Sequence, residues 1–461
     1  MGAYIEVTVP DMMQAREARF FMQQTMLARY PGAALVCLTM NVAGAVKTTP
    51  DIERAFSWGM GKIRAVLAAE KLLFEADIHE KTGPEAVFVF MGNAAEVKRR
   101  LCLLEDGAAM GRLLDIDVIR PDGEKIARTQ IGLPARKCLL CGQDAPVCAR
   151  SRAHTVKELF ERTHAIIDAH FAAQYVKHTA QQAQRALLYE VAIMPKPGLV
   201  DRANTGAHTD MDIFSFIDSA CALRDYFEVC VQTGLDCREK DPQDCFDRLR
   251  TPGLLAEQAM KDATGGVNTH KGAIFSLGIY CAALGMGYDS ETSDVHAALV
   301  RCGEMTHERM AQELERIGAQ EARTFGEAIY KKSHIGGVRA EAASGFAAVR
   351  ESSLPRLHEA LAAGLNLNDA GLCALVSLMA RTQDTNAVRR GGEKWAERIR
   401  ESAVGLHARI TGLLDEGRLA GQMEAIKQVL ARWDEAMSEK GISPGGCADL
   451  LALTLLAHFM E

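Results

Sequence analysis

The pattern of hydrophobic and polar residues changes character roughly a third of the way along the chain. In the first third, short apolar runs at 34–40 and 86–91 are rich in Val and Phe and predict β-strands, and 50–76 reads as a helix between them. Residues 112–119 and 125–130 flank an Arg-Pro-Asp-Gly-Glu turn, which predicts a hairpin. We therefore expect a mixed α/β domain here.

Beyond about residue 155, stretches rich in Ala, Leu, Glu, Arg and Gln repeat their apolar positions with helical spacing, and strand-like segments disappear. This pattern predicts helices at 155–193, 211–233, 252–262, 271–285, 290–315, 338–363, 367–381, 393–437 and 445–460. No repeat or low-complexity linker marks the boundary, so we place it within 155–185 and assign domains 1–175 and 176–461. The predicted fold class is an N-terminal α/β or α+β domain, with a nucleotidyltransferase-like fold as one option, followed by a larger all-α domain.

Composition and charge narrow the class of protein. With 461 residues, of which 48% are hydrophobic and 25% charged, the chain can form more than one packed core. It shows no long apolar run and no basic-then-apolar leader, so we expect neither a membrane span nor a signal peptide. A net charge of −7 argues against nucleic-acid binding. Most of the thirteen cysteines are scattered singly along the chain, which indicates reduced thiols and not disulfides. We therefore expect a cytoplasmic protein with no membrane or nucleic-acid partner.

Five polar clusters interrupt the apolar background of the helical half. They occupy residues 190–211, 263–272, 336–345, 381–392 and 443–449. Each alone could be a loop with capping side chains, since Asp, Asn, Ser and Thr cap helices routinely. Together they mix Lys and Arg, which suit phosphate, with Asp and Glu, which suit a divalent metal. The clusters indicate a polyphosphate ligand with Mg²⁺, although the sequence has neither a Walker A loop nor a dinucleotide fingerprint.

The same clusters carry a resemblance to a known family. From about residue 180 to residue 461, the chain resembles the triphosphoribosyl-dephospho-CoA synthase family, with the motifs in family order. The matching motifs are Met194-Pro-Lys-Pro-Gly-Leu-Val-Asp201, Asn204-x-Gly-Ala-His-x-Asp-Met211, Asn268-Thr-His-Lys-Gly272, Arg339-Ala-Glu-Ala, Asp384-Thr-Asn386 and Ser443-Pro-Gly-Gly-Cys-Ala-Asp449. The sequence departs from the family at Met194 and at Val338, and neither departure removes a charged group.

The resemblance implies that the 2′-hydroxyl of 3′-dephospho-CoA attacks the ribose of ATP and displaces adenine, while the triphosphate stays on the ribose. This chemistry needs a carboxylate base, an acid for the leaving adenine, and Mg²⁺ with cations around the triphosphate. For the base or the metal we name Asp201, Asp210 and Glu341, with Asp384 as a further candidate. For substrate and phosphate binding we name Lys196, Asn204, His208, Asn268, His270, Lys271, Arg339, Asp384 and Asn386. His208 and His270 could serve as the acid or donate to a phosphate, or either could instead be a structural residue.

In the N-terminal half, Asp115 and Asp117 are spaced as a carboxylate pair on a strand. Residues i and i+2 of a strand face the same side, so both side chains should point the same way. Such a pair suits Mg²⁺ for transfer at phosphorus, and Arg112, three residues earlier, suits a phosphate. The alternative is an edge strand with a polar face.

Cys138, Cys141, Cys148 and His154 follow this segment and form the second chemical feature of this half. Three thiols and an imidazole can complete a tetrahedral zinc site, and the first spacing suits a zinc knuckle. Residues 120–158 hold eight Lys and Arg against four Asp and Glu, so a basic surface surrounds these four residues. That surface could bind phosphates or an acidic protein partner, or be a solvated basic face.

This half also resembles a known family, that of the citrate lyase holo-acyl-carrier-protein synthase, or apo-citrate lyase phosphoribosyl-dephospho-CoA transferase. The resemblance covers about 1–175, is loose at 34–47, and is carried by Gly111-Arg-Leu-x-Asp-Ile-Asp-Val118, Pro134-x-Arg136-x-Cys-Leu-Leu-Cys141 and Val147-Cys-Ala-Arg-x-x-x-His154. It implies that a serine of the acyl carrier subunit attacks the phosphate next to the ribose of the precursor and that pyrophosphate leaves. Asp115 and Asp117 would bind Mg²⁺ and activate the hydroxyl, and Arg136 would join Arg112 at the phosphates. The Gly-Ser pair that usually precedes the carboxylates in polymerase-like nucleotidyltransferases is missing.

The two resemblances support each other, because the C-terminal half would make the substrate of the N-terminal half. We therefore predict a bifunctional enzyme that matures citrate lyase, with ATP, 3′-dephospho-CoA and the acyl carrier subunit as its partners. Two alternatives stay open. One is the same chemistry serving malonate decarboxylase, against which the cysteines and histidine favour citrate lyase, and the other is a non-catalytic, zinc-dependent binding protein.

Overall fold

The computed structural model describes residues 5–289, 294–319, 328, 330–331 and 335–461. The chain separates into two compact units, Met1–Ala173 and Gln174–Glu461, and passes from the first to the second inside the helix α5 (Val156–Ala192). Among the helices of the described ranges, none is both long enough and apolar enough to cross a membrane.

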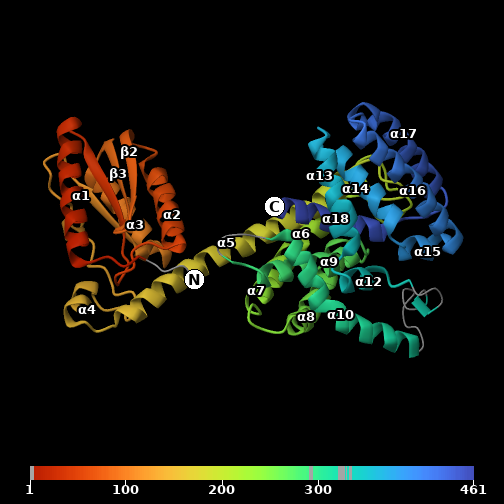
Figure 1. Ribbon diagram of the computed structural model, residues 1–461, viewed down its shortest axis with the longest axis horizontal. Coiled ribbons are helices and arrows are strands. Elements are labelled where there is room, and N and C mark those ends of the chain that lie inside the picture. Colours follow the sequence, from red (N-terminus) through yellow and green to blue (C-terminus); the bar gives the residue numbers. More distant parts are fainter. Residues whose placement is uncertain (1–4, 290–293, 320–327, 329, 332–334) are drawn as a thin grey trace. The chain divides into compact units, whose positions relative to one another are not determined.

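The first unit is built on a four-stranded antiparallel sheet in the order β2-β3-β1-β4 (Figure 1). Its strands are β1 (Ala34–Met40), β2 (Lys71–Glu80), β3 (Gly83–Met91) and β4 (Leu114–Ile119). Helices α2 (Pro50–Leu67) and α3 (Ala94–Gly107) pack on one face through a core that includes Phe56, Phe88 and Ile116. Helix α1 (Val9–Arg29) covers the other face through Met22 and Met26. Short helices η1 (Met110–Leu113), η2 (Arg128–Ile131) and α4 (Ala145–Ser151) complete the unit.

The prediction that the first unit combines helices with a sheet is confirmed, and the sheet is antiparallel. Two details of the prediction are wrong. The predicted helix 50–76 ends at Leu67, because Lys71 begins a strand that pairs along β3. Strand pairing thus overrides a pattern that alone resembled a continuing helix. The predicted hairpin is reduced to a single bridge between Ile119 and Lys125, and a 3₁₀ turn follows at 128–131.

The second unit is entirely helical in its described part (Figure 1). It contains the end of α5, then α6 (Ile213–Ala222), α7 (Arg224–Leu235), α8 (Pro242–Ala263), α9 (Lys271–Met286), α10 (Val295–Ala319), α12 (Gly337–Ala343), the π-helical turn η3 (Val349–Ser353), α13 (Leu354–Ala362), α14 (Leu367–Arg381), α15 (Thr385–Gly391), α16 (Glu393–Asp415), α17 (Leu419–Ser438) and α18 (Gly445–Met460). The all-α prediction for this half is therefore confirmed.

Three predicted helices are each divided in two. Leu223 separates α6 from α7, Gly345 follows α12, and Gly417 lies between α16 and α17. Both glycines have φ between 66 and 68°, a left-handed conformation that commonly ends helices. Helix α8 begins ten residues before the predicted position 252, because Asp241 caps it and Pro252 is accommodated inside it. Residues 290–293, the start of another predicted helix, lie outside the described ranges.

Helices α7 and α9 pack unusually close together through two glycines. A methyl group added at Gly234 would overlap the Ala282 carbonyl oxygen, and one added at Gly285 would overlap the Val231 carbonyl oxygen. Almost every residue of α9 after its first turn is buried. This contact fixes the position of α9, whose first turn contains the last residues of the second polar cluster, 263–272.

Replacing Gly234 with alanine should therefore lower the free energy of unfolding by about 1–3 kcal/mol, the usual cost of overpacking. Urea denaturation followed by circular dichroism measures the change. The control is Gly253→Ala in α8, where the added methyl would meet no atom closer than 3.8 Å. That variant should keep or slightly raise stability, since alanine favours a helix over glycine. Equal losses in the two variants would contradict the close-packing explanation.

Candidate functional site

All five polar clusters line one cavity of the helical unit, with a volume of about 750 Å³. This volume lies within the range of small-molecule sites. Nine of the predicted residues line the cavity: Lys196, His208, Asp210, Asn268, His270, Lys271, Glu341, Asp384 and Asn386. The fold thus brings together segments that are up to about 260 residues apart in the sequence, as a single site formed by all five clusters requires.

A buried ion pair lies at the inner wall of this cavity. The Lys196 ammonium pairs with the Glu190 carboxylate and also donates to the Glu190 carbonyl oxygen at 2.8 Å. Both side chains are almost fully buried, with exposed fractions of 1% and 4%. Burial raises the pKa of Glu190, and Lys196 opposes that shift. Breaking such a pair would leave a charge in a low-dielectric environment, so the pair holds the end of α5 against the following loop.

His270 is a second buried group at the cavity wall. Its Nδ1 lies 2.6 Å from Ser219 Oγ, and the Phe216 ring packs edge-on against it at 4.9 Å. Its Nε2 is buried without a hydrogen-bond partner in the described part of the chain. Burial lowers the pKa of His270 to about 3, with a smaller contribution from Lys196. The imidazole is therefore neutral at pH 7, and its Nε2 can hydrogen-bond a ligand in the cavity.

His208 is held from both sides at the cavity rim. Its Nε2 lies 3.0 Å from Ser443 Oγ, and Arg390 Nη2 lies 3.2 Å from its Nδ1. Burial and then Arg390 lower the pKa of His208, while Asp210, whose Oδ1 is 3.9 Å from Nδ1, raises it. The neutral imidazole accepts from Arg390 and fixes that guanidinium beside the cavity.

Besides Glu190, three carboxylates with raised pKa values line the cavity: Glu341 of α12, Asp384 at the N-cap of α15 and Asp449 of α18. Burial raises the pKa of Glu341, of Asp384 and, more strongly, of Asp449, whose pKa Glu190 and Asp384 raise further. Asp384 also caps α15, and its Oδ2 accepts the backbone N–H of Cys447 at 2.9 Å. A methyl at Gly272 would overlap the Asp449 carboxylate, so only glycine leaves room for it. Carboxylates with raised pKa values are suited to general-base catalysis or to a metal.

Three predicted residues do not line the cavity and have structural contacts instead. The Asp201 carboxylate accepts the backbone N–H groups of Lys196 and Ala203 at 2.9 and 2.7 Å, so it braces the loop and we do not retain it as a base. Asn204 donates to Asp434 at 2.8 Å. Arg339 pairs with Glu313 at 3.2 Å.

Some lining residues were missing from the predicted set: Glu190, Arg381, Arg390, Ser443 and Asp449. All five lie inside the polar clusters that the sequence had marked. Their charge and position were visible, whereas their orientation depends on helix packing that periodicity alone does not give.

In the N-terminal unit, the Asp115–Asp117 pair lies on β4, opposite Thr39 and Cys37 of β1 and on the face that α1 covers. Cations face both carboxylates: Lys125 Nζ lies 2.5 Å from Asp117 Oδ2, and Arg136 Nη1 lies 3.7 Å from Asp115 Oδ1. The prediction that both side chains share one face is confirmed by this register.

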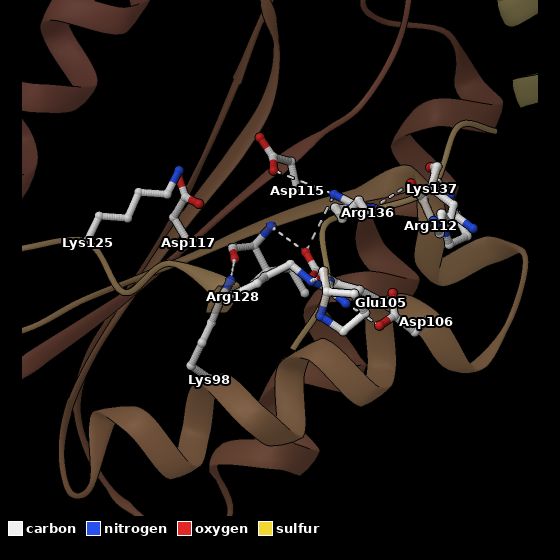
Figure 2. A network of polar contacts seen from close by, with 12 residues as sticks. Lys98, Glu105, Asp106, Arg112, Asp115, Asp117, Lys125, Arg128, Arg136 and Lys137 are labelled. Atoms are coloured by element: carbon white, nitrogen blue, oxygen red, sulfur yellow. Dashed lines mark hydrogen bonds and ion pairs between the residues drawn. The ribbon is translucent and has the colours of Figure 1, made fainter. Parts of the chain in front are cut away.

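The strand that carries the pair is held by two buried side chains of α3 (Figure 2). Glu105 Oε1 accepts the Ile116 N–H at 3.2 Å, and Lys98 Nζ donates to the Ile116 carbonyl at 2.6 Å. Arg128 Nη1 lies 2.9 Å from Glu105, and Arg136 Nη1 lies 3.6 Å from it. Ile116 lies between the two aspartates. These contacts therefore fix the backbone of β4 and with it the direction of both aspartate side chains. Burial raises the pKa of Glu105, and the surrounding cations oppose the shift.

Cys138, Cys141, Cys148 and His154, here termed the Cys/His cluster, converge so that one ligand atom of each lies within 4.8 Å of the others. The backbone N–H of Gln143, with His154 and Cys148, lowers the pKa of Cys141 to about 6. His154 Nε2 is buried with no hydrogen-bond partner among the described residues. Tetrahedral zinc places its ligand atoms roughly 3.5–3.8 Å apart, so only small shifts separate this group from a metal site. The cluster can hold a metal ion.

Comparison with known proteins gives the chemistry for each unit. Residues 176–461 match the family described as ATP:dephospho-CoA triphosphoribosyl transferase, and residues 7–170 match apo-citrate lyase phosphoribosyl-dephospho-CoA transferase. The chain is also 32% identical to Protein CitXG of Haemophilus influenzae, over 98% of this chain and 96% of that protein. It belongs to this family of fused transferases.

Other relatives agree with this assignment. Protein CitXG of Leuconostoc mesenteroides subsp. cremoris is 32% identical over 96% of this chain and 95% of that protein. The 2-(5''-triphosphoribosyl)-3'-dephosphocoenzyme-A synthase of Pectobacterium atrosepticum is 39% identical over 60% of this chain and 88% of that protein. The chain is thus a bifunctional transferase of citrate lyase maturation, which decides against the malonate decarboxylase alternative and against a non-catalytic binding protein.

In this transferase, replacing Lys196 with methionine should lower the free energy of unfolding by about 3–5 kcal/mol, because Glu190 would keep a buried charge without a partner. The double variant Lys196→Met with Glu190→Leu should recover most of that loss, since no charge then stays buried. Urea denaturation of both variants measures the difference. A double variant no more stable than the single one would contradict this account of the pair.

Proposed function

We propose that the cavity of the helical unit is where ATP and 3′-dephospho-CoA react to form 2′-(5″-triphosphoribosyl)-3′-dephospho-CoA and adenine. The observation that carries this proposal is the convergence of all five polar clusters on one cavity of about 750 Å³. The wall combines the two kinds of side chain that the reaction needs, carboxylates with raised pKa values and several cations. In a site that excludes water, both act more strongly than they would in solution.

Within this cavity we assign roles by position and charge. Glu341 would take the proton from the attacking 2′-hydroxyl, because its burial-raised pKa makes it a stronger base. Lys271 and Arg390 would hold the triphosphate, and Asp210 would hold Mg²⁺, which supplies charge neutralisation of the phosphates when bound. The unused Nε2 of His270 would hydrogen-bond the adenine as it leaves.

We propose that the Asp115–Asp117 face of the N-terminal unit transfers phosphoribosyl-dephospho-CoA to a serine of the citrate lyase acyl carrier subunit, with release of pyrophosphate. The two carboxylates would hold Mg²⁺ and orient the serine hydroxyl. Arg136, already 3.7 Å from Asp115, would meet the phosphate that is attacked. In phosphoryl transfer, positioning and charge neutralisation supply most of the catalysis.

We further propose that the Cys/His cluster holds a structural zinc ion. Three thiols and one imidazole are a donor set of closed zinc sites, and His154 Nε2, which has no hydrogen-bond partner among the described residues, would be the fourth ligand atom. The role would be structural, because a zinc ion would fix Cys138 and with it the preceding Arg136, which lies 3.7 Å from Asp115.

Reciprocal variants test whether the two sites are separate. Glu341→Gln should lower adenine release from ATP and 3′-dephospho-CoA by about 100-fold, while carrier labelling from pre-made precursor persists. Asp115→Asn should have the opposite pattern, with labelling of the carrier lost and adenine release kept. The exposed Glu239→Gln and Asp122→Asn are the matched controls and should change neither activity. Loss of both activities in either folded variant, or no adenine release by the wild-type chain, would refute the assignment.

Metal analysis of the purified chain should find about one zinc ion per chain, held by the Cys/His cluster. Cys148→Ser should reduce the zinc content to less than half, because a hydroxyl is a poor replacement for a thiolate ligand. Cys221→Ser, at an exposed cysteine of α6, is the control and should leave the metal content unchanged. Less than about a tenth of an equivalent in the wild-type chain would exclude this role for the cluster.

A further inference from the structure

A small basic pocket of about 290 Å³ lies in the N-terminal unit beside the Cys/His cluster. Four cations line it: Arg112, Arg136, Lys137 and Arg152. No Asp or Glu belongs to its lining within the described part of the chain. Cys138, Cys148 and His154 form part of its wall, so the pocket and the metal-binding loop share residues.

Backbone carbonyls hold two of these cations, Arg112 and Arg136 (Figure 2), whereas Lys137 pairs with Asp144 at 2.8 Å. Arg136 Nη2 donates to the Arg112 carbonyl at 2.8 Å, and the Arg112 guanidinium donates to the Lys137 carbonyl. A carbonyl carries no net charge, so these two bonds leave the guanidinium charges in place, and within the described ranges Arg136 is offset only by Glu105 at 3.6 Å and Asp115 at 3.7 Å. Arg112 Nε is buried and has no hydrogen-bond partner among the described residues. A buried donor without a partner costs free energy unless a ligand satisfies it, and a guanidinium donor favours a phosphate oxygen.

We propose that this pocket binds the pyrophosphate part of the triphosphoribosyl substrate and retains it as the leaving group. The proposal rests on the transfer reaction proposed above. At about 290 Å³ the pocket is at the lower end of ligand sites, so it suits the anionic tail of the substrate and not the whole conjugate. Arg136 links it to the reaction centre, since this residue both lines the pocket and lies 3.7 Å from Asp115.

The transfer explains why cations are needed at this position. The serine oxygen bonds to the phosphorus next to the ribose, and its proton passes to a carboxylate. The bond from that phosphorus to the bridging oxygen breaks, and its electron pair leaves with pyrophosphate. Negative charge therefore grows on the bridging oxygen, where guanidinium groups stabilise it.

The test measures the inhibition constant of inorganic pyrophosphate and the KM of the precursor during carrier labelling by the full chain. Arg152→Gln should raise both by about three- to tenfold, the loss of one charge-assisted contact. The matched control is Arg162→Gln, an exposed residue of α5 that does not line the pocket. It should change neither constant, and the KM of the carrier and the rate of adenine release should stay the same in both variants.

Equal effects of the two variants would overturn the proposal, because general surface charge would then explain them. A change confined to the KM of the carrier would also overturn it and would assign the basic residues to the protein partner. Calorimetric titration of pyrophosphate into the full chain gives a readout without turnover. Binding that weakens in Arg152→Gln and in folded Arg112→Gln supports the pocket even if the wild-type chain fails to label the carrier, an outcome that would refute only the proposed transfer.

Discussion

The buried pair of Lys196 and Glu190 is the interaction on which the cavity of the helical unit depends. It joins the last turn of α5 to the loop that follows, and the Lys196 backbone N–H is in turn held by Asp201. Gly198 continues this arrangement: its φ of 68° suits glycine, its N–H donates to Asp434 at 2.9 Å, and an added methyl would overlap the Ile442 carbonyl. The first part of the loop is therefore fixed by buried polar contacts, and His208 and Asp210 line the cavity from its second part.

Charge burial has the same organising effect elsewhere in the chain. Glu105 and Lys98 are almost fully buried in α3, yet each satisfies a backbone group of β4. Asp384 satisfies backbone N–H groups of α15 and α18 while it faces the cavity. In each case the polar group that shapes a site also completes a hydrogen bond that the fold requires. Substitutions at such positions therefore change stability and chemistry together, which is why matched double variants are needed to separate the two.

Much of this could be predicted from the sequence, and the failures have specific physical causes. Polar residues gathered in five loops marked the cavity correctly, because such loops between apolar helices indicate a binding site. The sequence could not show that Asp201 and Asn204 point to the backbone and to Asp434, since helix packing sets those directions. The sequence pattern also predicted that the helix continues through Lys71, whereas the segment from Lys71 pairs with β3 as a strand. The Asp115–Asp117 pair and the Cys/His cluster were found because short spacings need no tertiary information.

The contacts at Ile116 have a consequence for how the carrier subunit can approach. β4 is an edge strand, and such edges commonly recruit an extended segment of a partner by adding a strand. Here the outward N–H and carbonyl of Ile116 are bound by Glu105 and Lys98, and the Val118 carbonyl accepts from Ile126 at 2.9 Å. This edge therefore has no backbone groups to offer between the two aspartates. Under the proposed transfer, recognition of the carrier serine beside Asp115 would therefore rely on side chains and surface shape, because an extended peptide would find no free backbone group at Ile116 to pair with.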